Sequence, residues 1–422
     1  MIKAIKGTRD ILPPASGLWN HVEATVRRTF AQFNYQEIRT PIFEETVLFA
    51  RGVGAETDIV TKEMYSFPDR DGESITLRPE NTAGVIRAYI EHRLDQIPGT
   101  QKLYYMGPMF RRERPQKGRY RQFFQIGAEA IGSRDPAIDA EVIEMIAVLF
   151  DRLGIQGYRL LVNSVGDPEC RPRYIEALRE ALAGVKDKLS PDNQRRAETN
   201  PLRVLDSKEP QDEPIIAALP DIHDFLNDAC RQHFASVCRY LSDRGISYEV
   251  TPRLVRGLDY YTHTTFEFLH GALGAQNAMC GGGRYNGLAE SIGSRVPAPG
   301  VGFSIGEDRL MMAVEDAEAQ AGPGMARHRI DLYLAPMGDE AFRHCSILAR
   351  ELRNQGAVVE LAPSGKLKRA MELADKMQAR YALLVGDNEI AAGTYALKDM
   401  TSGEQLNVSR EELHSRFMLE SR

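Results

Sequence analysis

The sequence predicts an α+β protein with a mostly antiparallel central sheet flanked by helices, a helical insertion and a separate C-terminal α/β domain. Similar strand patterns between residues 37 and 305 are separated by long helical stretches, which favours an antiparallel core over a doubly wound parallel sheet. Residues 167–245 are charged, helical and interrupted by prolines, with few strand signals. After an Ala/Gly-rich segment at 317–328, strand and helix patterns alternate.

The first part of the chain contains helices and strands in mixed order. Pro13 and Pro14 precede a helical pattern whose apolar residues recur every three or four positions. Pro41 suits the edge or the start of a strand, and Gly154 suits the end of a helix. The expected elements are a helix over 18–33, an extended run over 37–43, a strand over 75–79, a helix over 82–94, strands over 102–110 and 122–131, a helix over 137–153 and a strand over 158–165.

Strand patterns return after the insertion and again in the C-terminal domain. The expected elements are strands over 247–251, 264–269, 276–280 and 300–305, followed by a strand over 329–335, a helix over 339–354, a strand over 357–361, a helix over 366–379 and strands over 381–385 and 394–398. We therefore divide the chain into a first core segment (1–166), the insertion (167–245), a second core segment (246–320), a linker (321–328) and a C-terminal domain (329–422).

Composition narrows the class of protein. The 422 residues are 43% hydrophobic and 27% charged, which excludes wholesale disorder and collagen- or mucin-like chains. The net charge of −6 means that any nucleic-acid contact depends on local basic patches. No apolar run reaches the roughly 18 residues of a membrane span, and the N-terminus lacks a signal-peptide core. Five scattered cysteines without C-x-x-C predict a reducing cytoplasm, no disulfide framework and no metal site.

A basic segment connects the two strands expected at 102–110 and 122–131. The sequence has no P-loop, no dinucleotide-binding glycine motif, no nucleophile elbow and no kinase motif set. Residues 111–121, RRERPQKGRYR, carry six basic residues against one acidic residue. Arginine side chains match phosphate groups bidentately, so this loop suits a triphosphate or an RNA backbone. The alternative is a solvated turn.

Four further segments carry candidate site residues. Gln125, Gly127 and Glu129 share one face of a strand and suggest the floor of a polar pocket, although a solvated sheet face is the alternative. The run 254–261, LVRGLDYY, offers an arginine and two tyrosines for a small-molecule cage, or simply packing. Glycines at 281–287 permit close backbone approach or a turn. Arg309, in the first turn of a helix, is opposed by the helix dipole, which favours a ligand role.

These segments together resemble the histidyl-tRNA synthetase family of class II aminoacyl-tRNA synthetases along essentially the whole chain. Motif 1 resembles the stretch ending at Arg39–Thr40–Pro41, motif 2 is MFRRERPQKGRYRQFFQ at 109–125, and motif 3 is GVGFSIGEDRL at 300–310. Two histidine-specific segments also match, LVRGLDYYTHTTFEF at 254–268 and CGGGRYNGL at 280–288.

The resemblance implies a class II antiparallel catalytic sheet, with motifs 1 and 2 in the first core segment and motif 3 in the second, and a C-terminal anticodon-binding domain. It implies a cytoplasmic homodimer with motif 1 in the interface and no membrane contact. The implied reaction activates L-histidine with ATP, as the adenylate, and transfers it to the 3′ end of tRNA(His). ATP is a substrate, Mg²⁺ is the expected cofactor, and no metal-ligand set is expected in the protein.

The resemblance also implies roles for individual residues. The expected catalytic residues are Arg111, Arg256 and Arg309, and ATP would contact Arg111, Glu113 and Arg309. Histidine would contact Glu80, Asn81, Thr82, Arg111, Gln125, Glu129, Arg256, Tyr260, Tyr261 and Tyr285, with Glu129 and Tyr261 on the two imidazole nitrogens. tRNA would contact Arg114, Gln116, Lys117 and Arg119.

Three residues depart from the pattern of many relatives: Asn81 replaces glycine, and Arg112 and Phe124 replace histidines. Two alternative functions remain open at this point. One is a non-catalytic paralogue that serves as the regulatory subunit of ATP phosphoribosyltransferase in histidine biosynthesis. Such chains usually lack the C-terminal domain and the arginine at the position of Arg256, both of which are present here. The other alternative is an RNA-binding or sensor module without catalysis.

Overall fold

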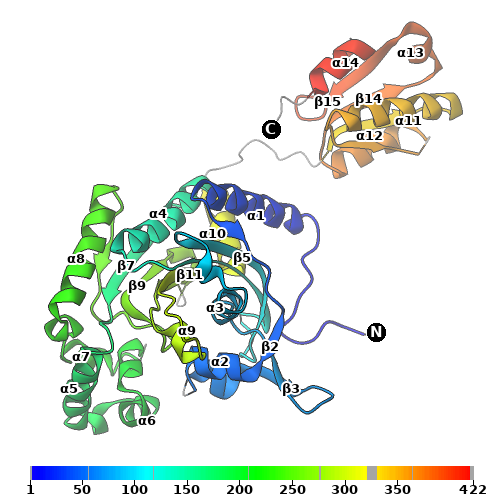
Figure 1. Cartoon of the computed structure of the whole chain (residues 1–422). Coiled ribbons are helices and arrows are strands. Elements are labelled where there is room, and N and C mark those ends of the chain that lie inside the picture. Colours follow the sequence, from blue (N-terminus) through cyan, green and yellow to red (C-terminus); the bar gives the residue numbers. More distant parts are fainter. Residues whose placement is uncertain are drawn as a thin grey trace. The chain divides into compact units, whose positions relative to one another are not determined.

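The computed structural model describes residues 2–55, 57–116, 118–207, 209–274, 277–320, 330–363 and 365–418. The chain forms two units, Met1–Gly322 and Pro323–Arg422, each with its own hydrophobic core (Figure 1). The predicted linker at 321–328 lies outside the described residues. Residues 317–320, which resembled the start of a linker, instead complete helix α10 (Glu307–Gln320).

An eight-stranded sheet forms the centre of the first unit. All its neighbouring strands pair antiparallel except the two edge pairs, β1–β5 and β7–β8, so the predicted mostly antiparallel sheet is confirmed. In spatial order the strands are β1 (Gln36–Glu37), β5 (Gln101–Phe110), β6 (Gln122–Ile131), β11 (Gly300–Gly306), β10 (Ala278–Arg284), β9 (Thr262–Leu269), β7 (Arg159–Ser164) and β8 (Glu249–Val250).

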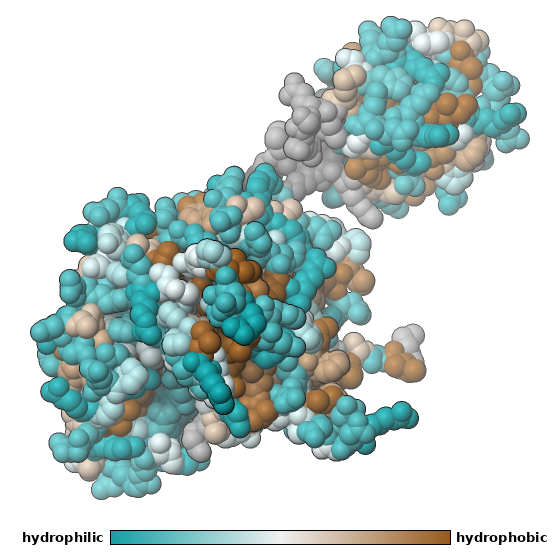
Figure 2. Space-filling view, viewed as in Figure 1, coloured by the Kyte–Doolittle hydropathy of each residue, from teal (hydrophilic) through white to brown (hydrophobic). Residues whose placement is uncertain are grey.

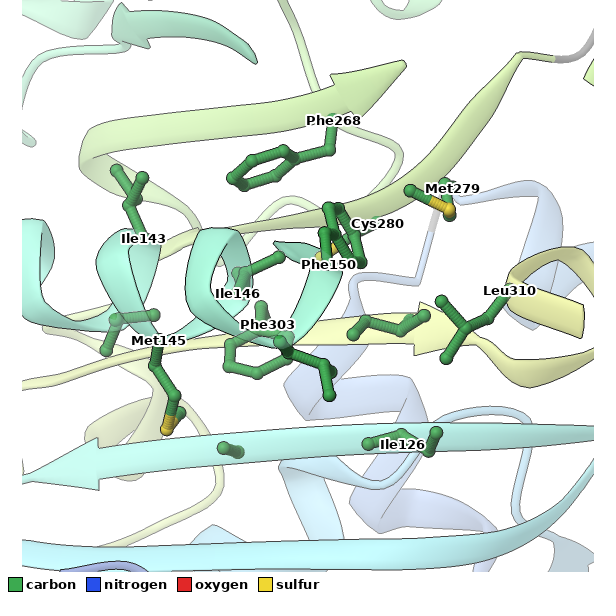
Figure 3. Close-up of a cluster of buried hydrophobic side chains, with 14 of the residues drawn as sticks. Ile126, Ile143, Met145, Ile146, Phe150, Phe268, Met279, Cys280, Phe303 and Leu310 are labelled. Carbon is green, nitrogen blue, oxygen red and sulfur yellow. The ribbon is translucent and has the colours of Figure 1, made fainter. Parts of the chain in front are cut away.

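Helices cover both faces of this sheet. On one face, α1 (Ala15–Gln32), α4 (Pro136–Arg152), α8 (Asp228–Asp243) and α10 bury a large apolar cluster. Figure 3 shows Ile143, Ile146 and Phe150 from α4 within this cluster, beside Phe268 and Phe303 from the strands. On the other face, α3 (Thr82–Glu91) and α9 (Leu288–Ser291) bury a smaller cluster, so this face keeps room for a polar site.

Smaller elements flank the smaller cluster. A three-stranded sheet has the order β2 (Phe43–Glu45), β4 (Ser74–Leu77), β3 (Tyr65–Pro68). Helix α2 (Thr46–Val53) follows β2 and packs against α3. A π-helix, η1 (Ile59–Glu63), and a 3₁₀ turn, η2 (Leu94–Gln96), also lie in this region, whereas the 3₁₀ turn η6 (Gly271–Leu273) packs against the large cluster.

The inserted segment folds around its own apolar cluster beside strands β7 and β9 (Figure 1). Within its described residues up to the start of α8, the structure has helices and 3₁₀ turns and no strand. They are α5 (Arg171–Ala183), η3 (Lys186–Lys188), α6 (Pro191–Thr199), η4 (Pro201–Asp206), α7 (Glu213–Ala217) and η5 (Ile222–Phe225).

The second unit is a five-stranded sheet with helices on both faces. Its order is β13 (Val359–Leu361), β12 (Ile330–Pro336), β14 (Ala379–Val385), β15 (Thr394–Asp399), β16 (Gln405–Ser409). The first three strands are parallel and the last two are antiparallel to their neighbours. The helices are α11 (Asp339–Asn354), α12 (Leu367–Lys376), α13 (Asp387–Ala392) and α14 (Arg410–Phe417). The sequence analysis did not find α13, β16 and α14.

The glycine run at 281–283 forms part of strand β10 rather than a turn. A Cβ atom at Gly281 would overlap the Arg256 guanidinium, and one at Gly282 would overlap the carbonyl of Gly302. Glycine is required here because the neighbouring strand and the arginine approach the backbone too closely for any side chain. The expected close backbone approach is therefore present at Gly281 and Gly282, and a turn follows the strand at 286–287.

Candidate active site

A polar cavity of about 760 Å³ lies on the sheet face that carries α3. The predicted residues that line it are Glu80, Thr82, Arg111, Glu113, Arg119, Gln125, Arg256, Tyr260, Tyr261, Tyr285 and Arg309. The strands supply this face by simple alternation: on β6, Ile126 and Ala128 enter the apolar core while Gln125, Gly127 and Glu129 face the other way. The predicted shared polar face is therefore present, and Gln125 on it lines the cavity.

Glu129 lies fully buried beneath the cavity floor. Its Oε1 accepts a hydrogen bond from Thr82 Oγ1 at 2.8 Å, and its Oε2 accepts one from the Tyr285 hydroxyl at 2.6 Å. Burial raises the pKa of Glu129 to about 8, although these two hydrogen bonds oppose the shift. Near neutral pH its carboxyl is therefore mostly protonated and close to the point of losing its proton.

The N-terminus of α3 forms one wall. Glu80 accepts hydrogen bonds from the backbone N–H groups of Thr82 at 2.7 Å and Ala83 at 3.1 Å. This carboxylate thus satisfies free donors of the first helical turn. Asn81 is buried but turns away from the cavity, because its Oδ1 accepts from Thr40 Oγ1 at 2.6 Å and Arg78 Nη1 at 3.4 Å. Of the predicted histidine contacts on this wall, Glu80 and Thr82 face the cavity and Asn81 does not.

Two tyrosines and an arginine form the opposite wall. The rings of Tyr260 and Tyr261 lie 4.8 Å apart, and Tyr260 also packs edge-on against Tyr285 at 5.8 Å. Arg256 forms an ion pair with Glu267 of β9. Gln125 lies nearby with its Oε1 buried and without a hydrogen-bond partner among the described residues, so an acceptor is available for a bound ligand.

The basic loop between β5 and β6 closes the polar end of the cavity. Arg111 donates from Nε to the Pro79 carbonyl at 2.9 Å and stacks over the Phe123 ring at 5.3 Å. Glu113 pairs with Arg119 at 3.0 Å and faces Arg111 at 3.8 Å. Arg309 donates to the Ala278 carbonyl at 2.6 Å. Burial, together with the nearby Arg119, lowers the pKa of Arg309, as expected for a partly enclosed cation close to other cations.

The predicted tRNA contacts occupy different positions in this loop. Arg114 and Gln116 are exposed, whereas Arg119 lines the cavity, and Lys117 lies outside the described residues. The other two departures from the family pattern also have defined places. Arg112 is exposed, and Phe124 belongs to the apolar core, with its ring 5.4 Å from that of Trp19. Neither side chain lines the cavity. The replacement of the two histidines of the family pattern by Arg112 and Phe124 therefore leaves the cavity wall unchanged.

The sequence analysis missed Tyr105, which lies opposite Gly127 and lines the cavity. A Cβ atom at Gly127 would overlap the Tyr105 ring. The bare glycine between Gln125 and Glu129 was therefore the available signal for a bulky neighbour. The Tyr105 hydroxyl is buried and has no geometric hydrogen-bond partner among the described residues, and burial raises its pKa well above the ordinary value.

The inserted segment also reaches the site, which the sequence analysis did not foresee. Arg203 of η4 donates to the carbonyl of Gly257, and Arg171 of α5 donates to the carbonyls of Tyr261 and Asp259. These arginines hold the backbone on both sides of the cavity's tyrosines. Asn193 and Arg196 of α6 line the cavity itself. The insertion is therefore part of the site's architecture.

Comparison with known proteins places this geometry in a family. Residues 7–310 match the family model for histidyl-tRNA synthetase, and residues 331–418 match that for an anticodon-binding domain. A histidine–tRNA ligase of Solibacter usitatus is 65% identical over 99% of both chains, and one of Koribacter versatilis is 57% identical over 98% of this chain and 95% of that one. The crystal structure of apo histidyl-tRNA synthetase from S. aureus is 38% identical, with a TM-score of 0.81 over 99% of this chain and 100% of that one. No helix within the described ranges has the length and apolar character to cross a membrane. The chain belongs to the histidyl-tRNA synthetase family.

Proposed function

We propose that this protein is a histidine–tRNA ligase. It activates L-histidine with ATP to histidyl-adenylate and pyrophosphate, and then transfers the histidyl group to the 3′ end of tRNA(His), releasing AMP. One observation carries the proposal: a single cavity joins a buried carboxyl–hydroxyl floor, made by Glu129, Thr82 and Tyr285, to a cluster of arginines. The floor suits an imidazole, and the arginines suit a triphosphate.

The floor would recognise the histidine side chain. We propose that Glu129 and Tyr261 bind the two imidazole nitrogens, while Tyr260 and Tyr285 line the ring. The amino group would be held by Glu80, Thr82 and the free Oε1 of Gln125. Asn81 would support this wall through its bonds to Thr40 and Arg78. Polar groups that contact both edges of a ring discriminate strongly against isosteres, because a wrong ligand leaves these buried groups without hydrogen-bond partners.

The arginines would stabilise the first chemical step. An oxygen of the histidine carboxylate attacks the α-phosphorus of ATP, and the bond to pyrophosphate breaks. Negative charge builds on the α-phosphate oxygens, and fixed cations around them lower the barrier. We propose that Arg111 and Arg256 flank the α-phosphate, that Arg309 binds the γ-phosphate and that Glu113 contacts the adenine edge. In the second step, the terminal ribose hydroxyl of tRNA attacks the activated carbonyl and AMP leaves.

Mg²⁺ fits this cavity as a companion of ATP. Two carboxylates lie beside the arginines: Glu113 is paired with Arg119, and Glu267 is paired with Arg256. The carboxylate of Glu80 accepts hydrogen bonds from backbone N–H groups. A magnesium ion held mainly by the nucleotide's phosphates and by water, with at most one or two of these carboxylates, suits such a donor set. When bound, it would neutralise phosphate charge.

Partner contacts and assembly complete the proposal. Arg114, Gln116, Lys117 and Arg119 would contact the acceptor end of tRNA(His), and residues 329–422 would bind its anticodon. The core segments at 1–166 and 246–320 would carry the catalytic residues, and the insertion at 167–245 would lie beside them. We also propose that the protein is a homodimer and that it acts in the cytoplasm. The basic residues of the loop support the tRNA contacts, because phosphate binding depends on local positive charge in an otherwise acidic chain.

Pyrophosphate exchange into ATP tests the proposal. Purified protein with magnesium is given each amino acid in turn, and we expect exchange with histidine alone. Exchange with a different amino acid would refute the recognition of histidine. Absence of exchange with every amino acid, in folded protein, would favour the regulatory-subunit alternative. That alternative has little support here, because Arg256 and the C-terminal unit are both present.

A further inference from the structure

Three potential metal ligands meet where the inserted segment joins the central sheet. Asp167 follows β7, Cys170 immediately precedes α5, and Cys230 lies in the first turn of α8. Their ligand atoms all lie within 4.8 Å of one another, and no other group of three such side chains does so in the part of the chain that the structure describes. His263, near the start of β9, lies at the edge of the group. The sequence predicted no metal site because these residues are far apart along the chain.

The separations resemble those in a tetrahedral zinc site. With Zn–S of about 2.3 Å and Zn–N of about 2.0–2.1 Å, ligand atoms lie roughly 3.5–3.8 Å apart. Here the two sulfur atoms are 3.9 Å apart, and Cys230 Sγ is 3.6 Å from His263 Nδ1. Asp167 Oδ1 is 3.1 Å from Cys170 Sγ because the thiol donates a hydrogen bond to it. Replacing that proton by a metal ion would lengthen this edge.

The surroundings hold these groups in place. Both sulfur atoms are buried, and a Cβ atom at Gly166 would approach Cys170 Sγ to 2.5 Å. Asn227 donates from Nδ2 to Asp167 Oδ2 at 3.0 Å, and its own Oδ1 caps α8 by accepting from the Cys230 N–H at 2.9 Å. Outer partners of this kind orient metal ligands in proteins.

His263 has an unusual backbone conformation, with φ of +50°. Few non-glycine residues adopt this left-handed region. Its ring stacks on that of His233, with centroids 4.9 Å apart. This conformation and the stacking place Nδ1 3.6 Å from Cys230 Sγ. The imidazole lies outside the group of three ligand atoms within 4.8 Å of one another, so the ring would have to move towards Asp167 and Cys170 to complete a tetrahedron.

We propose that Asp167, Cys170 and Cys230 bind Zn²⁺, with His263 as the fourth ligand. Binding converts two thiols into thiolates and releases two protons, with no change of oxidation state. Because Cys170 and Cys230 are 60 residues apart, the ion would connect the two ends of the inserted segment. Its role would be structural, holding the insertion against the β9 segment that follows Tyr261. The proposal is independent of the ligase function, and failure of either leaves the other standing.

Cobalt substitution tests this site directly. Full-length, reduced, metal-free protein is titrated with Co²⁺, and we expect saturation at one ion per chain. A sulfur-to-cobalt charge-transfer band in the near ultraviolet and the visible bands of tetrahedral cobalt should appear, and Zn²⁺ should abolish both. Absence of the charge-transfer band in folded, reduced protein would overturn the proposal.

Matched variants locate the ion. Cys170→Ser and Cys230→Ser should each lose about half of the charge-transfer intensity, whereas Cys345→Ser, in the C-terminal unit, should keep all of it. Asp167→Asn should weaken cobalt binding by at least about tenfold while the fold is retained, because the asparagine oxygen can still accept from the backbone N–H groups of Glu169 and Cys170, as Asp167 Oδ1 does. An unchanged band in the Cys170→Ser/Cys230→Ser double variant would contradict the assignment. Circular dichroism of each variant confirms that the compared proteins are folded.

Discussion

We expect Glu129 to determine how histidine binding depends on pH. Its pKa is about 8 because it is buried, yet an imidazole N–H binds the ionised carboxylate more strongly than the protonated carboxyl. Between about pH 7 and about pH 8 we therefore expect histidine binding to release a proton and to strengthen as the pH rises. Calorimetric titration in buffers of different ionisation enthalpy measures the number of protons that are released on histidine binding. Glu129→Gln, which has nearly the same shape, should bind histidine weakly and release none.

The same carboxyl makes a second, separable contribution to folding. Its folded-state pKa lies above the ordinary value of 4.5, so the folded state binds the proton more tightly. The contribution of this raised pKa to the free energy of unfolding is present at low pH and is lost as the pH rises from about 4.5 through about 8. Glu307 has a similarly raised pKa, so wild type must be compared with Glu129→Gln. The free energy of unfolding, measured with urea at about pH 6 and about pH 8.5, should decrease less between these two pH values in Glu129→Gln than in wild type. Equal decreases would contradict the assignment of this pH dependence to Glu129.

Arg256 is expected to act on the transition state more than on histidine binding. Arg256→Ala should slow adenylate formation by about 100- to 1000-fold while histidine still binds measurably, because additional negative charge develops on the α-phosphate oxygens in the transition state. Single-turnover adenylate formation and histidine titration measure the two effects separately. Arg253→Ala is the matched control, since Arg253 donates to carbonyls of the insertion, including Pro220, and does not line the cavity. Near-normal adenylate formation by Arg256→Ala would contradict its role.

At the scale of elements, the insertion positions the segment that carries Arg256 and the tyrosines. Arg203 of η4 donates to the Gly257 carbonyl, next to Arg256. A hydrogen bond from a charged group contributes about 1.5–3 kcal/mol, so Arg203→Gln should lower kcat/KM for histidine activation by at least about tenfold. We expect kcat to fall more than KM rises. Exposed Arg179→Gln, on α5, is the control. A uniform loss of activity explained by a lower melting temperature would contradict a positioning role.

At the scale of the whole molecule, an apolar surface suggests where two copies associate. Ile42, Phe43, Val47 and Phe67 are exposed on and beside β2, β3 and α2. Figure 2 shows apolar surface in the region where Figure 1 draws α3 and β2. Exposed apolar residues that gather in one region mark association surfaces. Motif 1, ending at Pro41, directly precedes these residues.

We therefore expect the protein to be a dimer, and Phe43→Asp to shift it towards monomers by placing a charge in the interface. Size-exclusion chromatography with light scattering measures the mass. As a control, Val250→Asp changes an exposed apolar residue on β8, an edge strand of the central sheet, and this variant should remain dimeric. A monomeric wild-type protein, or a dimeric Phe43→Asp variant, would contradict this interface.

Much of the fold and the site was accessible from local sequence pattern. Period-two alternation correctly separated Gln125, Gly127 and Glu129 from the apolar face of β6. Helical spacing identified α1, α4 and α11, because burial of one face imposes a regular apolar pattern. Short elements without such a pattern, such as α13 and β16, were missed. Family motifs then indicated the arginines and tyrosines of the cavity.

Tertiary structure alone decided which distant residues meet. Tyr105 enters the site because Gly127, on the neighbouring strand, leaves room for its ring, and Asn81 leaves the site because Thr40 and Arg78 bind its amide oxygen. Cys170 and Cys230 approach each other only when the insertion folds back on the sheet. Local spacing determines which face of an element a residue occupies. Contacts between elements depend instead on packing and register, which no single segment of the chain encodes.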